Sequence, residues 1–143
     1  MNFDKSKITK NFIILILIFF VCNCSKGVTD YIPYVQVQVT ISPAEIASSL
    51  PVGSAILKNG GYAGLIIYRL GEDQFMAYER LCTYYPNDTA FVVLDKSQTT
   101  ATCPKCKSSF ILTDGSKCND GPAQLGLRQY QCFYSNGRLS IVN

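Results

Sequence analysis

The sequence predicts an all-β domain built from small antiparallel sheets. Short strand-like runs rich in Val, Ile, Tyr and Phe recur along the chain, and turn residues such as Gly, Asn, Asp and Pro separate them. No long segment has the apolar period of roughly 3.6 residues that marks an amphipathic helix. With 48% hydrophobic residues in a chain of 143, one hydrophobic core can be buried.

The first half of the domain alternates strands with turns. Residues 34–41 contain the run Val-Gln-Val-Gln-Val, which predicts a half-buried strand with its valines inward. Residues 43–50 are expected to form one or two helical turns, which Pro51 ends. Three strands are then expected, at residues 55–58, 65–70 and 75–79.

The second half of the domain contains two loops and two hairpins. Its strands are expected at residues 91–94, 99–102, 110–112, 127–133 and 139–142. The loops span residues 82–89 and 103–108, on either side of the first hairpin. Asn136-Gly137 in the closing hairpin predicts a type I′ turn, because both central residues of that turn have positive φ.

The first 23 residues have the layout of a secretory signal peptide. Lys5, Lys7 and Lys10 form a basic start, and residues 12–21 are apolar without a break. This apolar stretch is too short to cross a bilayer, which takes roughly 20 residues. We therefore expect residues 1–23 to direct export and then to be removed.

Cys24 stands where the mature chain is expected to begin. A cysteine at this point, followed by Ser-Lys and a polar stretch, resembles the lipobox of bacterial lipoproteins, here of the Bacteroidetes type. The resemblance implies that Cys24 is lipidated, with Cys22 as the alternative. Residues 24–33 are then a short linker and residues 34–143 the domain. The linker would hold the domain close to a membrane of the cell envelope, within reach of membrane-bound protein partners.

The composition argues against several classes of function. Without residues 1–23 the chain keeps ten basic and nine acidic residues and has no basic cluster, so nucleic acid is not an expected partner. Histidine is absent, which removes the usual general base and the commonest nitrogen ligand for metals. Glu72 and Asp73 are adjacent acids, but they fall in a turn. We therefore expect no enzyme with substrate chemistry of its own.

Cysteines are the residues that point to chemistry. Five remain beyond the lipid-bearing one: Cys82, Cys103, Cys106, Cys118 and Cys132. Export places them where disulfides form, and an odd number leaves at least one thiol free, intermolecular or metal-bound. The informative segments are Leu81-Cys82-Thr83-Tyr84, Cys103-Pro104-Lys105-Cys106-Lys107-Ser108-Ser109-Phe110 and, after them, Gly121-Pro122-Ala123.

The order and spacing of these segments resemble the Rieske iron–sulfur domain. That family has a Cys-x-His loop, a hairpin, a Cys-x-x-His loop that runs into a Ser-x-Phe strand, a Gly-Pro-Ala loop and a final hairpin. The resemblance covers about residues 55–142. It implies an all-β Rieske-like domain with two ligand-type loops side by side at one tip, and it marks this chain as a degenerate member.

The resemblance also assigns the ligand positions. In the Rieske family two cysteines bind one iron of a 2Fe–2S cluster and two histidines bind the other. Cys82 and Cys103 keep the cysteine positions, whereas Tyr84 and Cys106 replace the histidines. A thiolate can ligate iron, but a phenol must first lose its proton, and its oxygen lies farther from the backbone than an imidazole nitrogen. An ordinary Rieske cluster is therefore not expected.

The supporting positions of the two loops match the family more closely. Ser108 matches the serine that bonds toward a cluster sulfur, and Gly121 and Pro122 match the loop that covers the cluster. Lys107 departs from the pattern, because it stands where a glycine is usual.

Three states compete with an altered cluster at these positions. Cys82 and Cys103, which the resemblance directs at one iron, can form a disulfide. Cys82, Cys103 and Cys106 can bind zinc, with a fourth ligand from Cys118, Tyr84 or water. The Cys103–Cys106 pair can also act as a redox dithiol, although the βαβ context of such motifs is missing.

Cys118 and Cys132 lie outside the Rieske-like loops, where a disulfide between them and burial as two small hydrophobes are both open. On these grounds we expect a membrane-anchored, non-catalytic binding or structural module without a cofactor. The alternatives are an electron-transfer protein with a 2Fe–2S cluster on altered ligands and, after it, a cysteine-ligated zinc module.

Overall fold

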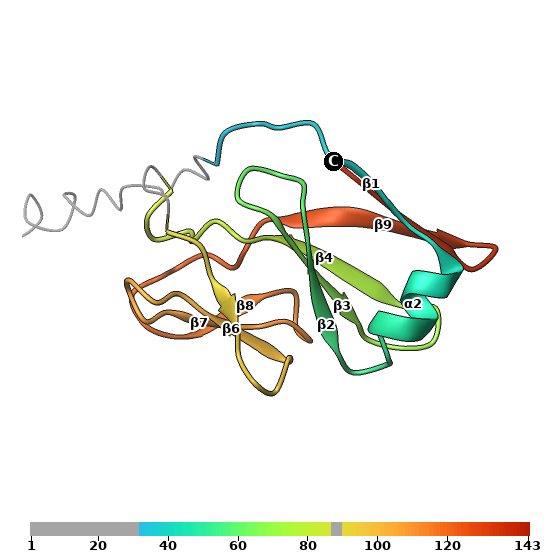
Figure 1. Cartoon of the computed structure of the whole chain (residues 1–143). Helices are drawn as coiled ribbons and strands as arrows, with labels where there is room; N and C mark the ends of the chain where they lie inside the picture. Colours follow the sequence, from blue (N-terminus) through green and yellow to red (C-terminus); the bar gives the residue numbers. More distant parts are fainter. Residues whose placement is uncertain (1–31, 87–89) are drawn as a thin grey trace, which may run out of the picture.

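The computed structural model describes residues 32–86 and 90–143, which form two antiparallel β-sheets and one short helix (Figure 1). In chain order the elements are β1 (Gln38–Ile41), α2 (Pro43–Ser49), β2 (Ala55–Lys58), β3 (Leu65–Arg69), β4 (Phe75–Glu79), β5 (Val93–Leu94), β6 (Thr100–Thr102), β7 (Ser109–Ile111), β8 (Lys117–Asp120), β9 (Gln129–Ser135) and β10 (Arg138–Val142). The larger sheet has the strand order β1-β10-β9-β4-β3-β2, and the smaller sheet has the order β5-β6-β7-β8. The predicted all-β class is confirmed.

The larger sheet encloses a core of mostly aliphatic side chains. The strands β1 and β10 pair so that Ile41 lies opposite Leu139 and Val39 lies opposite Ile141. Val37, Ile41, Leu139 and Ile141 are buried in this core, and Val39 packs against it. Val37 and Val39 of the predicted alternating run therefore point inward, as expected, whereas Val35 is half-buried and lies before the strand.

The closing hairpin is formed by β9 and β10. Asn136 and Gly137 connect the strands with φ values of 51° and 75°. A two-residue turn with both φ values positive matches the right-handed twist of the flanking strands. The predicted hairpin is therefore confirmed, and Figure 1 shows β9 running through the middle of the larger sheet.

The helix α2 begins where the sequence predicts. The Ser42 side chain accepts a hydrogen bond from the backbone N–H of Glu45 at 3.3 Å, and Pro43 lies in the first turn, where its missing N–H has no cost. Ile46 is the buried residue of the helix and packs into the core of the larger sheet. The helix thus covers one end of that sheet.

The smaller sheet packs on a second core, which the two sheets share. Tyr78 of β4 and Phe110 of β7 are fully buried in it, together with Cys82 and Cys103. The Tyr78 hydroxyl donates a hydrogen bond of 2.8 Å to the carbonyl of Leu112. Burial raises the pKa of this phenol above its ordinary value, so it remains a donor. This bond joins the two sheets.

A buried carboxylate holds the approach to the first cysteine loop. Glu79, at the end of β4, has no exposed surface. It accepts hydrogen bonds from the backbone N–H groups of Tyr62 at 2.7 Å, Ala63 at 2.8 Å and Leu81 at 3.2 Å, and from the Tyr130 hydroxyl at 2.8 Å. Four hydrogen-bond donors around this carboxylate offset the free-energy cost of burying it. The loop at residues 60–64 is thereby fixed to the strand that leads to Cys82.

The strand β8 lies between residues 112 and 127, where no strand is predicted from the sequence. Its sequence Lys-Cys-Asn-Asp is poor in strand-forming residues, so its strand geometry comes from pairing with β7. Gly115 and Ser116, with φ values of 61° and 57°, turn the chain back toward β7. The strand β1 is shorter than predicted, because the N–H of Val37 bonds to the side chain of Asn143 rather than to a neighbouring strand.

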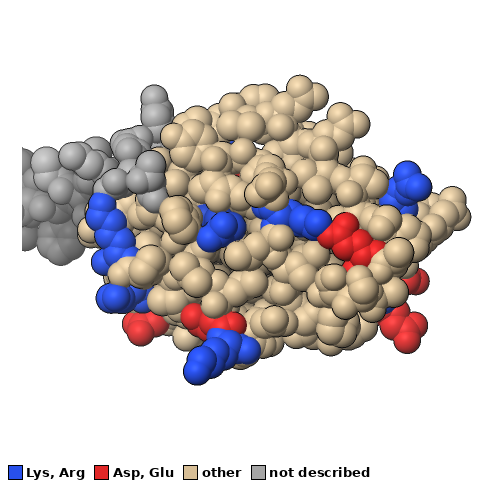
Figure 2. Space-filling view, in the orientation of Figure 1, with Lys and Arg blue, Asp and Glu red and all other residues tan. Residues whose placement is uncertain are grey.

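The predictions of export and lipidation fall outside the described residues. This applies to residues 1–23 and to the lipidation of Cys24 or Cys22. Among the described residues, no helix is long and apolar enough to cross a bilayer. On the face shown in Figure 2, basic and acidic side chains are interspersed and form no large patch of one sign. The absence of a nucleic-acid partner stays a prediction.

Candidate metal centre

The first cysteine loop begins directly after β4. Cys82 is fully buried, and its backbone N–H donates a hydrogen bond of 2.9 Å to the carbonyl of Ala90. The N–H of Tyr85 donates to the Cys82 carbonyl at 3.2 Å, which turns the chain immediately after the thiol. The backbone therefore fixes Cys82 from both sides, with its side chain in the shared core.

The second cysteine loop is the tight connection between β6 and β7. The N–H of Cys103 donates to the Ser108 carbonyl at 2.9 Å, and the N–H of Lys107 donates to the Cys103 carbonyl at 2.9 Å. Lys107 closes the loop with a φ of 65°, in the left-handed region that favours glycine. This explains why the related pattern has a glycine at that position.

Three thiols converge between these loops. The Sγ atoms of Cys82, Cys103 and Cys106 all lie within 4.8 Å of one another. The Sγ atoms of Cys82 and Cys106 are 3.5 Å apart. Thiolates around one tetrahedral ion are about 3.8 Å apart when the metal–sulfur bonds are about 2.3 Å. The three sulfur atoms therefore lie about as close together as binding of one such ion requires.

A third segment packs against Ser108, whose hydroxyl lies next to the Cys106 sulfur. The Ser108 hydroxyl oxygen lies 3.2 Å from the Cys106 sulfur and accepts a hydrogen bond of 3.0 Å from the N–H of Ala123. A Cβ atom on Gly121 would lie 2.5 Å from the Ser108 Cα atom, so this position has no room for a side chain. The structure thus brings Ser108 and Gly121 to the thiols, with the exposed Pro122 between Gly121 and Ala123.

Hydrogen bonds make the thiols unequal. Burial raises the pKa of Cys82 to about 12, although the backbone N–H of Tyr84 bonds to its sulfur and opposes that rise. Burial also acts on Cys106, but bonds from the Ser108 hydroxyl and N–H and from the other two thiols outweigh it and lower its pKa. Of Cys82 and Cys106, Cys106 is therefore the thiol that ionises more readily.

Tyr84 contributes its backbone to the site rather than its ring. The ring is 46% exposed and packs edge-to-face on Tyr85, with 4.8 Å between centroids. The ammonium of Lys105 lies 4.6 Å above the Tyr85 ring. The two rings and the lysine cover the outer side of the loop, and the role of the Tyr84 phenol as a metal ligand stays a prediction.

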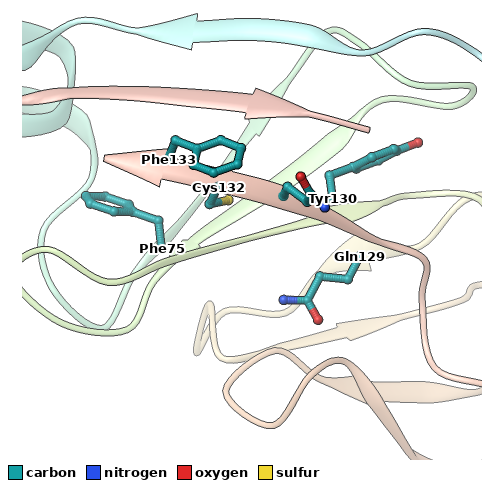
Figure 3. A pocket seen from close by; sticks show the side chains of 6 residues that line it. Phe75, Gln129, Tyr130, Cys132 and Phe133 are labelled. Atoms are coloured by element: carbon teal, nitrogen blue, oxygen red, sulfur yellow. The ribbon is translucent and has the colours of Figure 1, made fainter. Parts of the chain in front are cut away.

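The remaining two cysteines lie in different sheets. Cys118 is on β8 and packs against the shared core, whereas Cys132 is on β9 and packs against the core of the larger sheet. Cys132 lines a pocket of about 580 Å³ with Phe75 and Phe133 (Figure 3). All five cysteines in the described ranges are free thiols. The predicted Cys82–Cys103 and Cys118–Cys132 disulfides stay predictions.

The chain was compared with protein-family models, curated proteins and solved structures. No protein-family model matches the chain, and no curated protein matches it. Among solved structures, a chain in the complex of reduced oxygenase and oxidized ferredoxin in carbazole 1,9a-dioxygenase is 25% identical, with a TM-score of 0.53, over 76% of this chain and 94% of that one. The chain has a Rieske-like fold. The ferredoxin of carbazole 1,9a-dioxygenase from Nocardioides aromaticivorans IC177 is 17% identical, with a TM-score of 0.50, over 76% of this chain and 97% of that one.

The Rieske-like fold and the thiol group together allow a metal or iron–sulfur cofactor. The residues present do not fit a cluster held by two cysteines and two histidines, because the chain contains no histidine. Cys106 takes one of the vacated positions, and the ring contact of Tyr84 is with Tyr85. The resemblance also assigns Cys82 and Cys106 to different irons, whereas their sulfurs lie 3.5 Å apart. The described donor set is therefore three grouped thiols, without the two histidines of such a cluster.

Proposed function

We propose that this protein is a lipid-anchored module with a Rieske-like fold whose tip binds one thiophilic metal ion, zinc in the first place. Cys82, Cys103 and Cys106 supply three thiolates, and a fourth ligand completes the tetrahedron. The role is non-catalytic: the ion holds the two loops and the segment after β8 in one arrangement. This departs from the cofactor-free module expected from the sequence, because three thiols already face one another.

The observation that supports this proposal is the 4.8 Å grouping of the three sulfur atoms. The hydrogen-bond donors around the sulfur atoms also suit a bound metal better than three neutral thiols. The Tyr84 N–H and the Ser108 N–H and hydroxyl all bond to sulfur, and such donors stabilise thiolates more than thiols.

Electron transfer through a 2Fe–2S cluster with altered ligands is the second candidate. It is favoured by the likeness to a chain of the ferredoxin–oxygenase complex, at 25% identity. Four ligands are needed for such a cluster, two on each iron. The described site offers three grouped thiols, so this candidate requires both a fourth ligand and a wider spacing between Cys82 and Cys106.

The anchor and the partner are part of the same proposal. The backbone carbonyl of Ile32 accepts a hydrogen bond of 3.0 Å from Arg128, in the connection between β8 and β9. Thr83 of the first cysteine loop bonds to Leu125 of that same connection at 2.8 Å. The eight steps along the chain from Cys24 to Ile32 span about 28 Å at most. A lipid on Cys24 therefore keeps the metal tip near the membrane and near membrane-bound protein partners.

The direct test is to purify the full chain without oxygen, with mild detergent where the membrane fraction holds it. Iron, zinc and free thiols are then measured per chain, and the visible spectrum is recorded. We expect a colourless protein with one zinc ion per chain that Cys82→Ser loses. Cys132→Ser is the matched control, because it removes a partly buried thiol from the other sheet and should leave the zinc in place.

Two results would contradict the proposal. A brown protein with two irons per chain would establish the cluster instead. A metal-free protein with two of the three grouped thiols oxidised would establish a disulfide, for which the 3.5 Å contact between Cys82 and Cys106 gives the nearest geometry. Palmitate labelling of the full chain and of Cys24→Ala tests the anchor separately, since equal labelling would exclude lipid on Cys24.

A further inference from the structure

Cys118 lies on the face of the smaller sheet that packs against the core containing Cys82 and Cys103. In the register of β7 and β8, Cys118 is opposite Phe110. Opposite residues of an antiparallel pair project from the same face of a sheet. Phe110 is fully buried among Cys82 and Cys103, and Cys118 and Cys106 both pack against this same core. A fourth cysteine is therefore presented to the group of three.

A bulge in β8 lies directly beside Cys118. Ser109 pairs with Asp120 and Phe110 pairs with Cys118, so Asn119 is the extra residue between two registered pairs. Bulges re-aim side chains next to functional sites. Directly beyond the bulge, Gly121 packs on Ser108, whose hydroxyl contacts the Cys106 sulfur. The segment after the bulge therefore lies against the residue that contacts the Cys106 sulfur.

The Cys118 thiol has no strong partner that holds it away. Its sulfur donates a weak hydrogen bond of 3.3 Å to the Asp120 carbonyl, two residues along the same strand. Burial raises the pKa of Cys118, and electrostatic repulsion from Cys106 raises it further. Because Cys118 is outside the 4.8 Å group, its side chain must rotate inward to reach a shared ion.

We propose that Cys118 supplies the fourth ligand and makes the site a four-cysteine zinc centre, an inference that rests on the proposed function. Binding releases four thiol protons to solvent for each zinc ion, with no change in oxidation state, and leaves a site charge of −2. Lys105 and Lys107, both in the second loop, supply nearby positive charge. Tyr84 and water are the competing fourth ligands.

Cobalt tests the ligand count, because its visible and near-ultraviolet bands depend on how many thiolates bind it. The full chain is stripped of metal, reduced and titrated with Co²⁺ alone. The wild type should give a four-thiolate spectrum, and Cys118→Ser should lose about a quarter of the thiolate-to-cobalt band and bind Zn²⁺ at least about tenfold more weakly. Cys132→Ser, the matched control, should keep both values.

A second measurement needs no variant. In the wild type, Zn²⁺ should slow alkylation of Cys118 by iodoacetamide by at least about tenfold, as it does for the three grouped thiols, and should leave Cys132 unchanged. Unchanged alkylation of Cys118, or a Cys118→Ser cobalt spectrum equal to that of the wild type, would overturn this inference and leave the three-cysteine site standing. Failure of the wild type to bind either metal would instead overturn the proposed function.

Discussion

The two sheets of this protein are held together in different ways. In the larger sheet, strands of four to seven residues pair along their length over an aliphatic core. In the smaller sheet, strands of two to four residues surround a core that includes Cys82 and Cys103. The smaller sheet thus depends on loop contacts and on its thiols, so the residues that shape the candidate metal centre also hold this sheet together.

The largest effect on the smaller sheet is expected from a side chain at Gly121. Gly121→Ala should remove most of the stability of the smaller sheet, by more than about 3 kcal/mol, because the new Cβ would lie 2.5 Å from the Ser108 Cα atom. The free energy of unfolding is measured by urea denaturation of the metal-free protein. Zinc binding by the same variant should fall with it.

Gly53→Ala is the matched control for that clash. Gly53 and Gly121 have similar φ values, 83° and 91°, so both substitutions carry the penalty of a left-handed residue, about 1–2 kcal/mol. A Cβ on Gly53 meets nothing within 4 Å. The difference between the two variants therefore isolates the contact with Ser108, and equal losses would show that Gly121 is needed only for its backbone conformation.

The next largest effect is expected at Glu79, which joins the larger sheet to the start of the first cysteine loop. Glu79→Gln puts an amide NH₂ against a site built of four donors, and it should cost about 2–3 kcal/mol. Tyr130→Phe removes only one of those donors and should cost about 1 kcal/mol. Urea denaturation measures both. If Glu79→Gln leaves the free energy of unfolding unchanged, the buried carboxylate does not hold the loop that leads to Cys82.

The sequence predicted the larger sheet better than the smaller one for physical reasons. Alternating valines and the Asn136-Gly137 turn specify β1 and the closing hairpin locally. The strand β8 has no such local signal, because its geometry comes from β7. The motif spacing led to Cys82, Cys103 and Cys106 through a resemblance. It could not show that Cys82 and Cys106 are in contact, since that distance depends on how two loops fold against each other.

No pattern in the sequence indicated that Glu79 would be a buried, hydrogen-bonded carboxylate. Its donors come from residues 17, 16 and 51 positions away as well as from its near neighbour Leu81. A single acid at the end of an apolar strand is ordinarily a solvated residue. Only the tertiary arrangement, which brings the loop at residues 60–64 and Tyr130 to the same carboxylate, makes it a structural centre.

The thiol of Cys132 gives the larger sheet a pH response of its own. Burial raises its pKa from 9.0 to about 11. Below pH 9 the thiol is protonated in both the folded and the unfolded chain. As the pH rises from 9 to 11 the unfolded chain ionises first, so the free energy of unfolding of the metal-free, reduced protein should fall.

Cys132→Ala should make that alkaline decline shallower, without changing the stability that the smaller sheet draws from zinc at neutral pH. The measurement is urea denaturation at pH 8, 9, 10 and 11 with a reductant present. Cys82 adds a decline of the same sign, because burial raises its pKa to about 12, so some slope should remain in the variant. Identical slopes in wild type and Cys132→Ala would contradict the assignment to Cys132.

The smallest expected effect is a gain in stability at Lys107. This exposed residue closes the second cysteine loop with a φ of 65°, and Lys107→Gly relieves left-handed strain while it adds freedom to the unfolded chain. The net gain should be about 0.5–1 kcal/mol in the metal-free protein, by urea denaturation. Asn136→Gly, at a φ of 51° in the larger sheet, is the control and should gain less, because asparagine already tolerates this conformation. A gain at Asn136 as large as at Lys107 would mean that the second loop carries no more strain than an ordinary hairpin turn, and the smaller sheet would then differ from the larger one in its contacts alone.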